Sequence, residues 1–199
     1  MESFQSQNKR TERLTDLCLR VIGNQAGKKD IDDLAADINN VEPNEVISIV
    51  EVVIKKGKDM DDNKRRLSKV LNIIHKGISN YKWKLPDENL FLKDMMKENS
   101  HLKERLNKLK KYMKGINESE GFFSMARSDM NSFLDNVLIL KEIEYHYLKK
   151  ENILFPYLEK HGGHLKCLPV MWSIHDDVRS SLKHIGQLRE EGVKDVKTL

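Results

Sequence analysis

Apolar residues recur at helical spacing along almost the whole chain, and no stretch alternates in the manner of a half-buried strand. Pro43 favours the start of a helix, because proline is tolerated in the first helical turn, and Gly57 favours its end. In the first part of the chain this pattern predicts helices over residues 11–21, 30–38, 45–56 and 61–81.

The second part of the chain predicts longer helices, separated by a loop over residues 115–121. A bend is expected near Pro156, because proline removes a backbone hydrogen bond, and the two glycines after His161 end that helix. The predicted helices cover residues 87–113, 123–160 and 169–191.

Pro86 marks the boundary between the two parts, because the residue before a proline disfavours helix. We therefore predict an all-α protein with a smaller N-terminal helical domain over residues 1–84 and a helical bundle over residues 85–199. The N-terminal helices are short, so we expect them to pack on the second domain.

Composition supports a charged helical bundle, with 33% charged and 39% hydrophobic residues. The net charge of +4 comes from interspersed residues of both signs, so we expect no nucleic-acid partner. No stretch approaches the ~20 apolar residues of a membrane span, and the N-terminus lacks the apolar core of a signal peptide. The two cysteines form no CxxC motif, which fits the reducing cytoplasm, the predicted location.

Motifs of enzyme chemistry are missing from the sequence. It contains no HExxH run, no phosphate-binding glycine loop and no recognisable pairing of a nucleophile with a base. We therefore expect that this protein is not an enzyme.

Seven histidines occur, and bundles build iron sites from imidazoles and carboxylates that project inward from facing helices. At about 100° per residue, His146 lies roughly 60° to one side of the apolar face of its helix and Glu151 roughly 70° to the other. His175 lies at the edge of an apolar stripe and can turn inward, whereas Asp176 points outward on this count. His75 follows two apolar residues, and a packed histidine is the simpler interpretation. Spacing alone leaves the metal site open.

Two sequence runs resemble a known family. HYLKKENILFPYLEKHG, from residue 146 to 162, and LPVMWSIHDDVRSSL, from 168 to 182, resemble consecutive helices of hemerythrin-like HHE cation-binding domains. VEPNEVISIVEVVIKKG, from residue 41 to 57, resembles the domain that usually precedes them, a family of unknown function numbered 438. The resemblance implies a four-helix, up-down bundle that holds mononuclear or dinuclear non-haem iron and responds to oxygen, nitric oxide or redox state.

The resemblance also implies which residues bind the metal. His146 and Glu151 match the histidine and carboxylate of one helix, and His175 matches the histidine of the next, with Asp176 beside it. Lys150 stands where many members of the family have a glutamate.

Two departures suggest an incomplete bundle. The run Leu90–Phe91 replaces a histidine–proline pair that precedes Glu98 and Asn99 in the family, and the sequence ends before a fourth helix. We expect that an N-terminal helix completes the site, with His75 as an extra donor, or that the chain forms a homodimer.

Three functions remain open from the sequence. The first is a metal-binding sensory or regulatory module with a protein partner or output domain. The second is a metal-free interaction scaffold, in which His175 pairs with Glu151, Lys150 pairs with an acid and Trp172 lies in the core. The third is haem binding through one or two histidines, in the groove that a missing fourth helix would expose.

Overall fold

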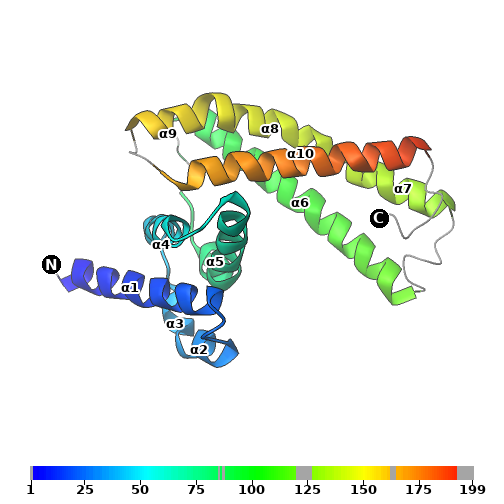
Figure 1. Cartoon of the computed structure of the whole chain (residues 1–199). Helices are drawn as coiled ribbons and strands as arrows, with labels where there is room; N and C mark the ends of the chain where they lie inside the picture. Colours follow the sequence, from blue (N-terminus) through cyan, green and yellow to red (C-terminus); the bar gives the residue numbers. More distant parts are fainter. Residues whose placement is uncertain (1, 85, 87, 120–126, 162–164, 192–199) are drawn as a thin grey trace. The chain divides into compact units, whose positions relative to one another are not determined.

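A computed structural model describes residues 2–84, 86, 88–119, 127–161 and 165–191. The predicted all-α class is confirmed, because these residues form helices and the described part contains no strand (Figure 1). The chain divides into two compact units. Unit 1 comprises Met1–Trp83 and Leu158–Ile174, and unit 2 comprises Lys84–Tyr157 and His175–Leu199.

Unit 1 is built on five helices from the first part of the chain. They are α1 (Glu2–Ile22), α2 (Lys28–Asp33), α3 (Ala35–Asn39), α4 (Pro43–Lys55) and α5 (Met60–Asn80). The single helix expected over 30–38 is broken at Leu34, whose backbone lies between the two short helices α2 and α3. Asn24 takes a left-handed conformation just after α1, with a φ of 56°, and this turns the chain away from the helix.

The core of unit 1 is apolar. Leu14, Leu17, Ile49, Val53 and Ile74 are among its fully buried side chains. Helix α5 approaches the end of α3 so closely at one position that only glycine fits. A Cβ atom on Gly77 would lie 1.9 Å from the carbonyl oxygen of Ile38.

Polar contacts complete unit 1. Glu45 is 2% exposed, and its carboxylate accepts hydrogen bonds from Arg10 at 2.5 to 3.2 Å and from Thr11 at 3.0 Å. Glu51 accepts the backbone N–H groups of Lys166 and Cys167, both at 3.0 Å. The second of these residues begins α10, so the Glu51 carboxylate supplies acceptors for orphan donors of a helix start.

Unit 2 contains longer helices. The elements in or entering this unit are α6 (Leu90–Ser119), α7 (Arg127–Leu138), the 3-10 turn η2 (Ile139–Glu142), α8 (Ile143–Lys149), the π-helix η3 (Lys150–Leu154), α9 (Phe155–His161) and α10 (Cys167–Glu191). The boundary between the units runs through α9 and α10. Residues 115–119 are helical, contrary to the predicted loop, and residues 120–121 of that loop lie outside the described residues.

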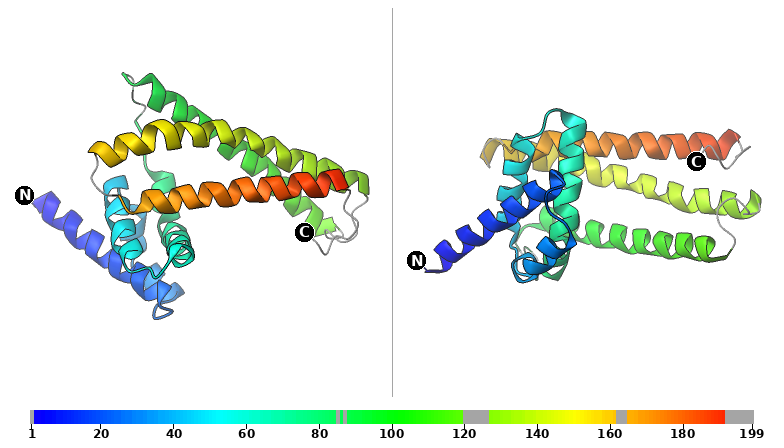
Figure 2. Two further views of the ribbon diagram at one scale, coloured as in Figure 1. Left: turned by 45° about the horizontal axis from the view of Figure 1, so that its top comes forward. Right: turned by 60° about the horizontal axis from the view of Figure 1, so that its bottom comes forward.

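The long helix predicted over 123–160 is interrupted twice, at η2 and at η3. Pro156 lies in the first turn of α9, directly after η3, so the expected bend near Pro156 coincides with the π-helical interruption. Figure 2 shows α7, η2, α8, η3 and α9 as one nearly continuous helical column. Residues 192–199 lie outside the described residues, so the expected lack of a fourth bundle helix stays a prediction.

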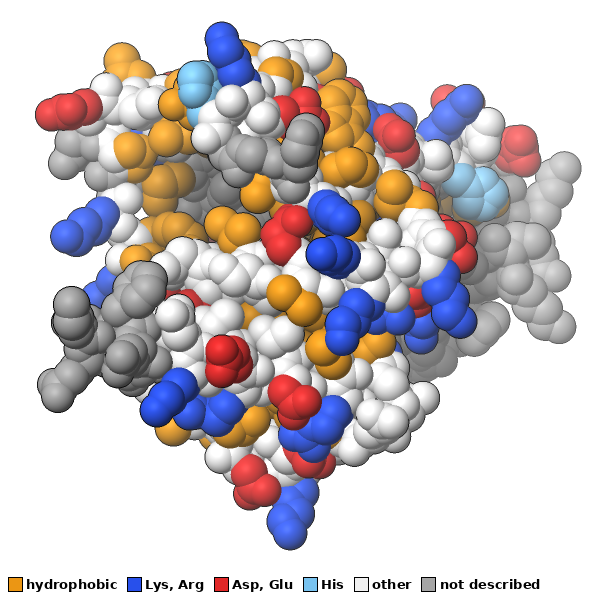
Figure 3. All heavy atoms as spheres, turned by 60° about the vertical axis from the view of Figure 1, so that its left-hand side comes forward, with side chains coloured by type: hydrophobic (Ala, Val, Ile, Leu, Met, Phe, Trp, Pro, Cys, Tyr) orange, Lys and Arg blue, Asp and Glu red, His pale blue; other side chains and the backbone are white. Residues whose placement is uncertain are grey.

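The apolar cluster of unit 2 is small. It joins α7 to α10 through Met130, Phe133, Leu134, Val137 and Leu182. On the face shown in Figure 3, acidic and basic side chains are interspersed with apolar ones, and neither sign dominates. Within the described residues, no helix is long and apolar enough to cross a membrane.

Candidate metal centre

The π-helix η3 places Glu151. The backbone N–H of Phe155 donates to the carbonyl of Lys150, five residues earlier, so this turn holds one residue more than a regular helical turn. A regular helix would put Glu151 to one side of the apolar face. The wider turn brings its side chain inside, where Glu151 is 5% exposed.

Glu151 meets His175 of α10. The Nδ1 atom of His175 lies 2.7 Å from Oε1 of Glu151, and His175 is 4% exposed. Burial lowers the pKa of His175, although the hydrogen bond with Glu151 opposes this effect. Burial alone would raise the pKa of Glu151, but hydrogen bonds from Arg179 and His175 outweigh it and lower that pKa. Both pKa shifts favour an ionised Glu151 carboxylate beside a neutral His175 imidazole.

Aromatic rings surround this pair. The Tyr147 ring stacks on the His175 ring with centroids 3.7 Å apart and planes 13° apart. Phe155, which is 1% exposed, stacks at 5.8 Å on the same imidazole. The guanidinium of Arg179 lies over the Tyr147 ring, 5.5 Å from its centroid. These contacts hold the His175 ring in one orientation.

A second pair joins α8 to α6. Nδ1 of His146 donates to Oε2 of Glu98 at 2.9 Å, and Lys149 also donates to that carboxylate. His146 is 6% exposed, and burial lowers its pKa. Its other ring nitrogen, Nε2, is buried and has no hydrogen-bond partner among the described residues. The Glu98 contact leaves Nε2 as the nitrogen with a free lone pair in the neutral ring.

Lys150 carries a positive charge that acts on both His146 and His175. Its ammonium group lowers the pKa of His146 and the pKa of His175. The side chain is half-buried, and burial lowers the pKa of Lys150 itself. Within the described residues Lys150 forms no hydrogen bond or ion pair, so the predicted pairing with an acid is wrong for that part of the chain.

The other candidate residues are not members of these two histidine–carboxylate pairs. The side chain of Asp176 is 70% exposed, and it accepts a hydrogen bond from Arg179 at 2.9 Å. His75 belongs to unit 1, is exposed on α5 and lies 3.4 Å from the Ser79 hydroxyl. The metal role of His75 and Asp176 stays a prediction. Across the described residues, no three or more His, Cys, Asp or Glu side chains are grouped closely enough to hold a metal ion.

Sequence reasoning missed two residues of this centre, Glu98 and Arg179. Both residues lie in the sequence runs that carry the family resemblance. Glu98 precedes Asn99, and Arg179 lies in the run from 168 to 182, so these runs could have indicated them. The expected hydrogen bond between His175 and Glu151 is confirmed. The expected burial of Trp172 is wrong, because its side chain is 38% exposed.

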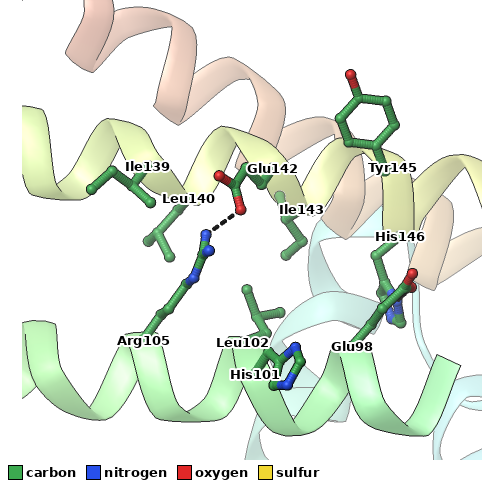
Figure 4. A pocket seen from close by; sticks show the side chains of 10 residues that line it. All are labelled: Glu98, His101, Leu102, Arg105, Ile139, Leu140, Glu142, Ile143, Tyr145 and His146. Atoms are coloured by element: carbon green, nitrogen blue, oxygen red, sulfur yellow. Dashed lines mark hydrogen bonds and ion pairs between the residues drawn. The ribbon is translucent and has the colours of Figure 1, made fainter. Parts of the chain in front are cut away.

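A groove of about 440 Å³ opens beside His146, between α6 and the column of η2 and α8. Figure 4 shows Glu98 next to His146 at one end of it, and Arg105 reaching across to an ion pair with Glu142. Leu102, Leu140 and Ile143 form its apolar part. His146 therefore lines one end of this groove.

The fold and these two pairs define the class of the protein. It is a helical protein whose unit 2 encloses histidine and carboxylate side chains that could donate to a cation. The comparison with protein families agrees, because the model of the hemerythrin HHE cation-binding domain matches residues 90–198. The chain belongs to this family, and its second part is a cation-binding domain. No curated protein and no solved structure matches the chain.

The donor set fits the cation that the family implies. Imidazole and carboxylate groups suit iron, zinc and related ions. The buried Nε2 of His146 supplies a lone pair that no described residue uses. The arrangement is that of two separate pairs, and the oxygens of Glu151 already accept hydrogen bonds from His175 and Arg179.

Proposed function

We propose that this chain is a hemerythrin-type regulatory module that binds non-haem iron and responds to oxygen, nitric oxide or redox state. The observation that carries the proposal is His146, which is 6% exposed and leaves Nε2 without a described partner. An imidazole that ligates a metal usually donates its other ring N–H to a carboxylate, as His146 does to Glu98.

Each residue of the centre would have a distinct task. His146, His175 and Glu151 would hold the ion, and iron, when bound, would supply affinity for a small diatomic ligand or a change of oxidation state. Glu98 keeps the His146 ring in the orientation that exposes Nε2. Tyr147 and Phe155 cover the His175 ring and keep water away from it.

The proposal extends to location and partners. We place the module in the cytoplasm, where it passes its signal to a protein partner or an output domain, with no role as an enzyme. Residues 41–57 support a preceding domain of the unknown-function family numbered 438. Homodimerisation or an N-terminal helix carrying His75 would supply further donors.

Iron content after anaerobic purification tests this function. We expect the wild-type protein to bind iron and to show a visible absorption band that changes with oxygen or nitric oxide. His146→Ala should lose the metal and keep its helical content. The matched control is His184→Ala, because His184 is exposed on α10, and it should retain the metal. A colourless wild-type protein with no affinity for added iron would contradict the proposal, and a Soret band would favour haem.

A metal-free interaction scaffold is the second candidate, and the compensated charge of Glu151 favours it. Both oxygens of this carboxylate already accept hydrogen bonds from protein groups. In that case His146→Ala and His175→Ala would change stability alone, and neither wild type nor variant would bind iron.

A further inference from the structure

Three carboxylates converge on one guanidinium in unit 2. Arg179 donates to Glu144 at 2.8 and 3.1 Å, to Glu151 at 2.8 and 3.1 Å and to Asp176 at 2.9 Å. Glu144 comes from α8, Glu151 from η3 and Asp176 from α10. A guanidinium that binds two carboxylates through paired N–H donors is held in one orientation.

This arrangement occupies the carboxylate that a metal would need. Oε1 of Glu151 accepts from His175 and Arg179, and Oε2 accepts from Arg179. A buried carboxylate needs a neighbouring cation, because an uncompensated charge away from water is very costly. Arg179 meets that need here, through its ion pair with Glu151 at 2.8 Å.

The carboxylates that bind Arg179 differ in their exposure to solvent. This difference allows the guanidinium to separate from the buried carboxylate while it stays bound to the exposed ones. Glu151 is 5% exposed, whereas the side chains of Glu144 and Asp176 are 42% and 70% exposed. Arg179 itself is 28% exposed. The guanidinium can therefore leave Glu151 towards solvent and keep the other two carboxylates as partners.

We propose that Arg179 is a built-in competitor of the metal ion for Glu151 and thereby sets the metal affinity of this module. The proposal rests on the proposed function for the identity of the ion. Metal entry exchanges one cation at Glu151 for another, so the Glu151 carboxylate has a neighbouring positive charge in both states. A metal-free centre is then a stable state of the protein, and only an ion that outcompetes the guanidinium binds.

Metal affinity of Arg179→Met tests the proposal, because methionine keeps bulk and removes the charge. Arg189→Met is the matched control, since Arg189 lies on the same helix and forms a similar two-bond pair with Asp135 of α7, at 2.8 and 3.1 Å. Iron(II) added anaerobically is the probe, and dissociation constants come from titration calorimetry. We expect Arg179→Met to bind at least tenfold more tightly than wild type and Arg189→Met to stay within twofold of it.

Stability supplies an independent readout. Without metal, Arg179→Met should melt below wild type, because Glu151 loses its cation, and added iron(II) should raise its melting temperature more than that of wild type. If Arg179→Met does not fold, Glu144→Gln replaces it. That change removes only an exposed partner, and it should tighten iron(II) binding by a smaller factor.

The outcomes separate this proposal from the proposed function. Equal or weaker binding by Arg179→Met, with a wild type that binds iron(II), would overturn the role of Arg179 and leave the function in place. Binding by Arg179→Met alone would support the competition and count against iron binding by the natural chain. No binding by either protein would overturn both.

Discussion

The two units of the chain fill their interiors in opposite ways. Among the described residues, the core cluster of unit 1 contains fifteen buried hydrophobic residues, whereas that of unit 2 contains five. In the part of the chain that the structure describes, unit 2 also buries His146, Glu151 and His175, and the buried charged residues of unit 1 are Glu45 and Asp62. Unit 1 is therefore stabilised chiefly by apolar burial, and unit 2 buries histidine and carboxylate side chains beside a smaller apolar cluster.

This difference indicates where function lies. Burying a polar or charged group costs free energy unless it is paired, and even a paired group seldom exceeds an apolar residue in stability. The polar interior of unit 2 is thus poorly explained by stability. It coincides with the part of the chain that belongs to the cation-binding family.

The largest effect is expected in the apolar core of unit 1. Ile74 is fully buried on α5, so Ile74→Ala should lower the free energy of unfolding by about 2–5 kcal/mol. Urea denaturation followed by circular dichroism measures this loss. Leu71→Ala is the control on the same helix, because Leu71 is 43% exposed and should change stability by less than about 1 kcal/mol. Equal losses at the two positions would contradict a tightly packed core in unit 1.

Removing the charge of Glu151 should lower the free energy of unfolding by less than Ile74→Ala does. Glu151→Gln keeps the size of the side chain and weakens its hydrogen bonds with Arg179 and His175, so we expect a loss of about 2 kcal/mol in chelator-treated protein. Guanidinium chloride unfolding measures the loss. It should be accompanied by weaker metal binding, which Ile74→Ala should leave unchanged.

An apolar replacement of the buried cluster sharpens the comparison. The triple change Glu151→Met, His175→Leu and Arg179→Met removes the buried pair and its guanidinium at once, and leaves the exposed carboxylates Glu144 and Asp176. Such replacements are often neutral or stabilising by about 1–4 kcal/mol. We expect a protein at least as stable as Glu151→Gln that binds no metal. A triple variant that is far less stable would show that the polar centre supports the fold.

The acid sensitivity of unit 1 should trace to Glu45. Burial would raise the pKa of Glu45, but hydrogen bonds from Arg10, Glu42 and Thr11 outweigh it and lower that pKa. A lowered folded-state pKa contributes stability that is present above the unfolded value of about 4.3 and is lost as pH falls through the folded value. The contribution at pH 7 should be about 1–2 kcal/mol. Unfolding free energies of wild type and Glu45→Gln should therefore converge as the pH falls from 5 to 3, and parallel curves would contradict this role.

The sequence predicted those features that depend on local spacing. Apolar periodicity, Pro43 and Gly57 located α4 and α5 to within a few residues, because each helix buries one face and its ends carry local signals. His146, Glu151 and His175 were identified by motif. The burial of His175 agrees with its predicted place at the edge of an apolar stripe.

The missed features depend on tertiary structure. The π-helix η3 moves Glu151 inward through a single backbone bond, from Phe155 to Lys150, which apolar spacing does not encode. The contact of His146 with Glu98 spans 48 residues and depends on how α6 packs against α8. Arg179 could be recognised as a partner of Glu151 only once that carboxylate had been placed.

The smallest effect is expected at two neighbouring lysines with different surroundings. Lys149 donates to Glu98, whereas Lys150 has no partner among the described residues and lies near both buried histidines. Lys150→Met should raise the free energy of unfolding by about 0.5–1 kcal/mol, because methionine has a similar length and carries no charge to desolvate.

Lys149→Met is the matched control, and it should lower stability by about 0.5 kcal/mol, since its side chain is 39% exposed and its ion pair is partly screened. Thermal unfolding in the presence of a chelator compares the two variants. Iron(II) should bind Lys150→Met more tightly than wild type, because a positive charge beside His146 and His175 is removed. If Lys150→Met lost stability instead, the Lys150 ammonium group would have to interact favourably with its surroundings. The buried charges of unit 2 would then be as well compensated as those of unit 1.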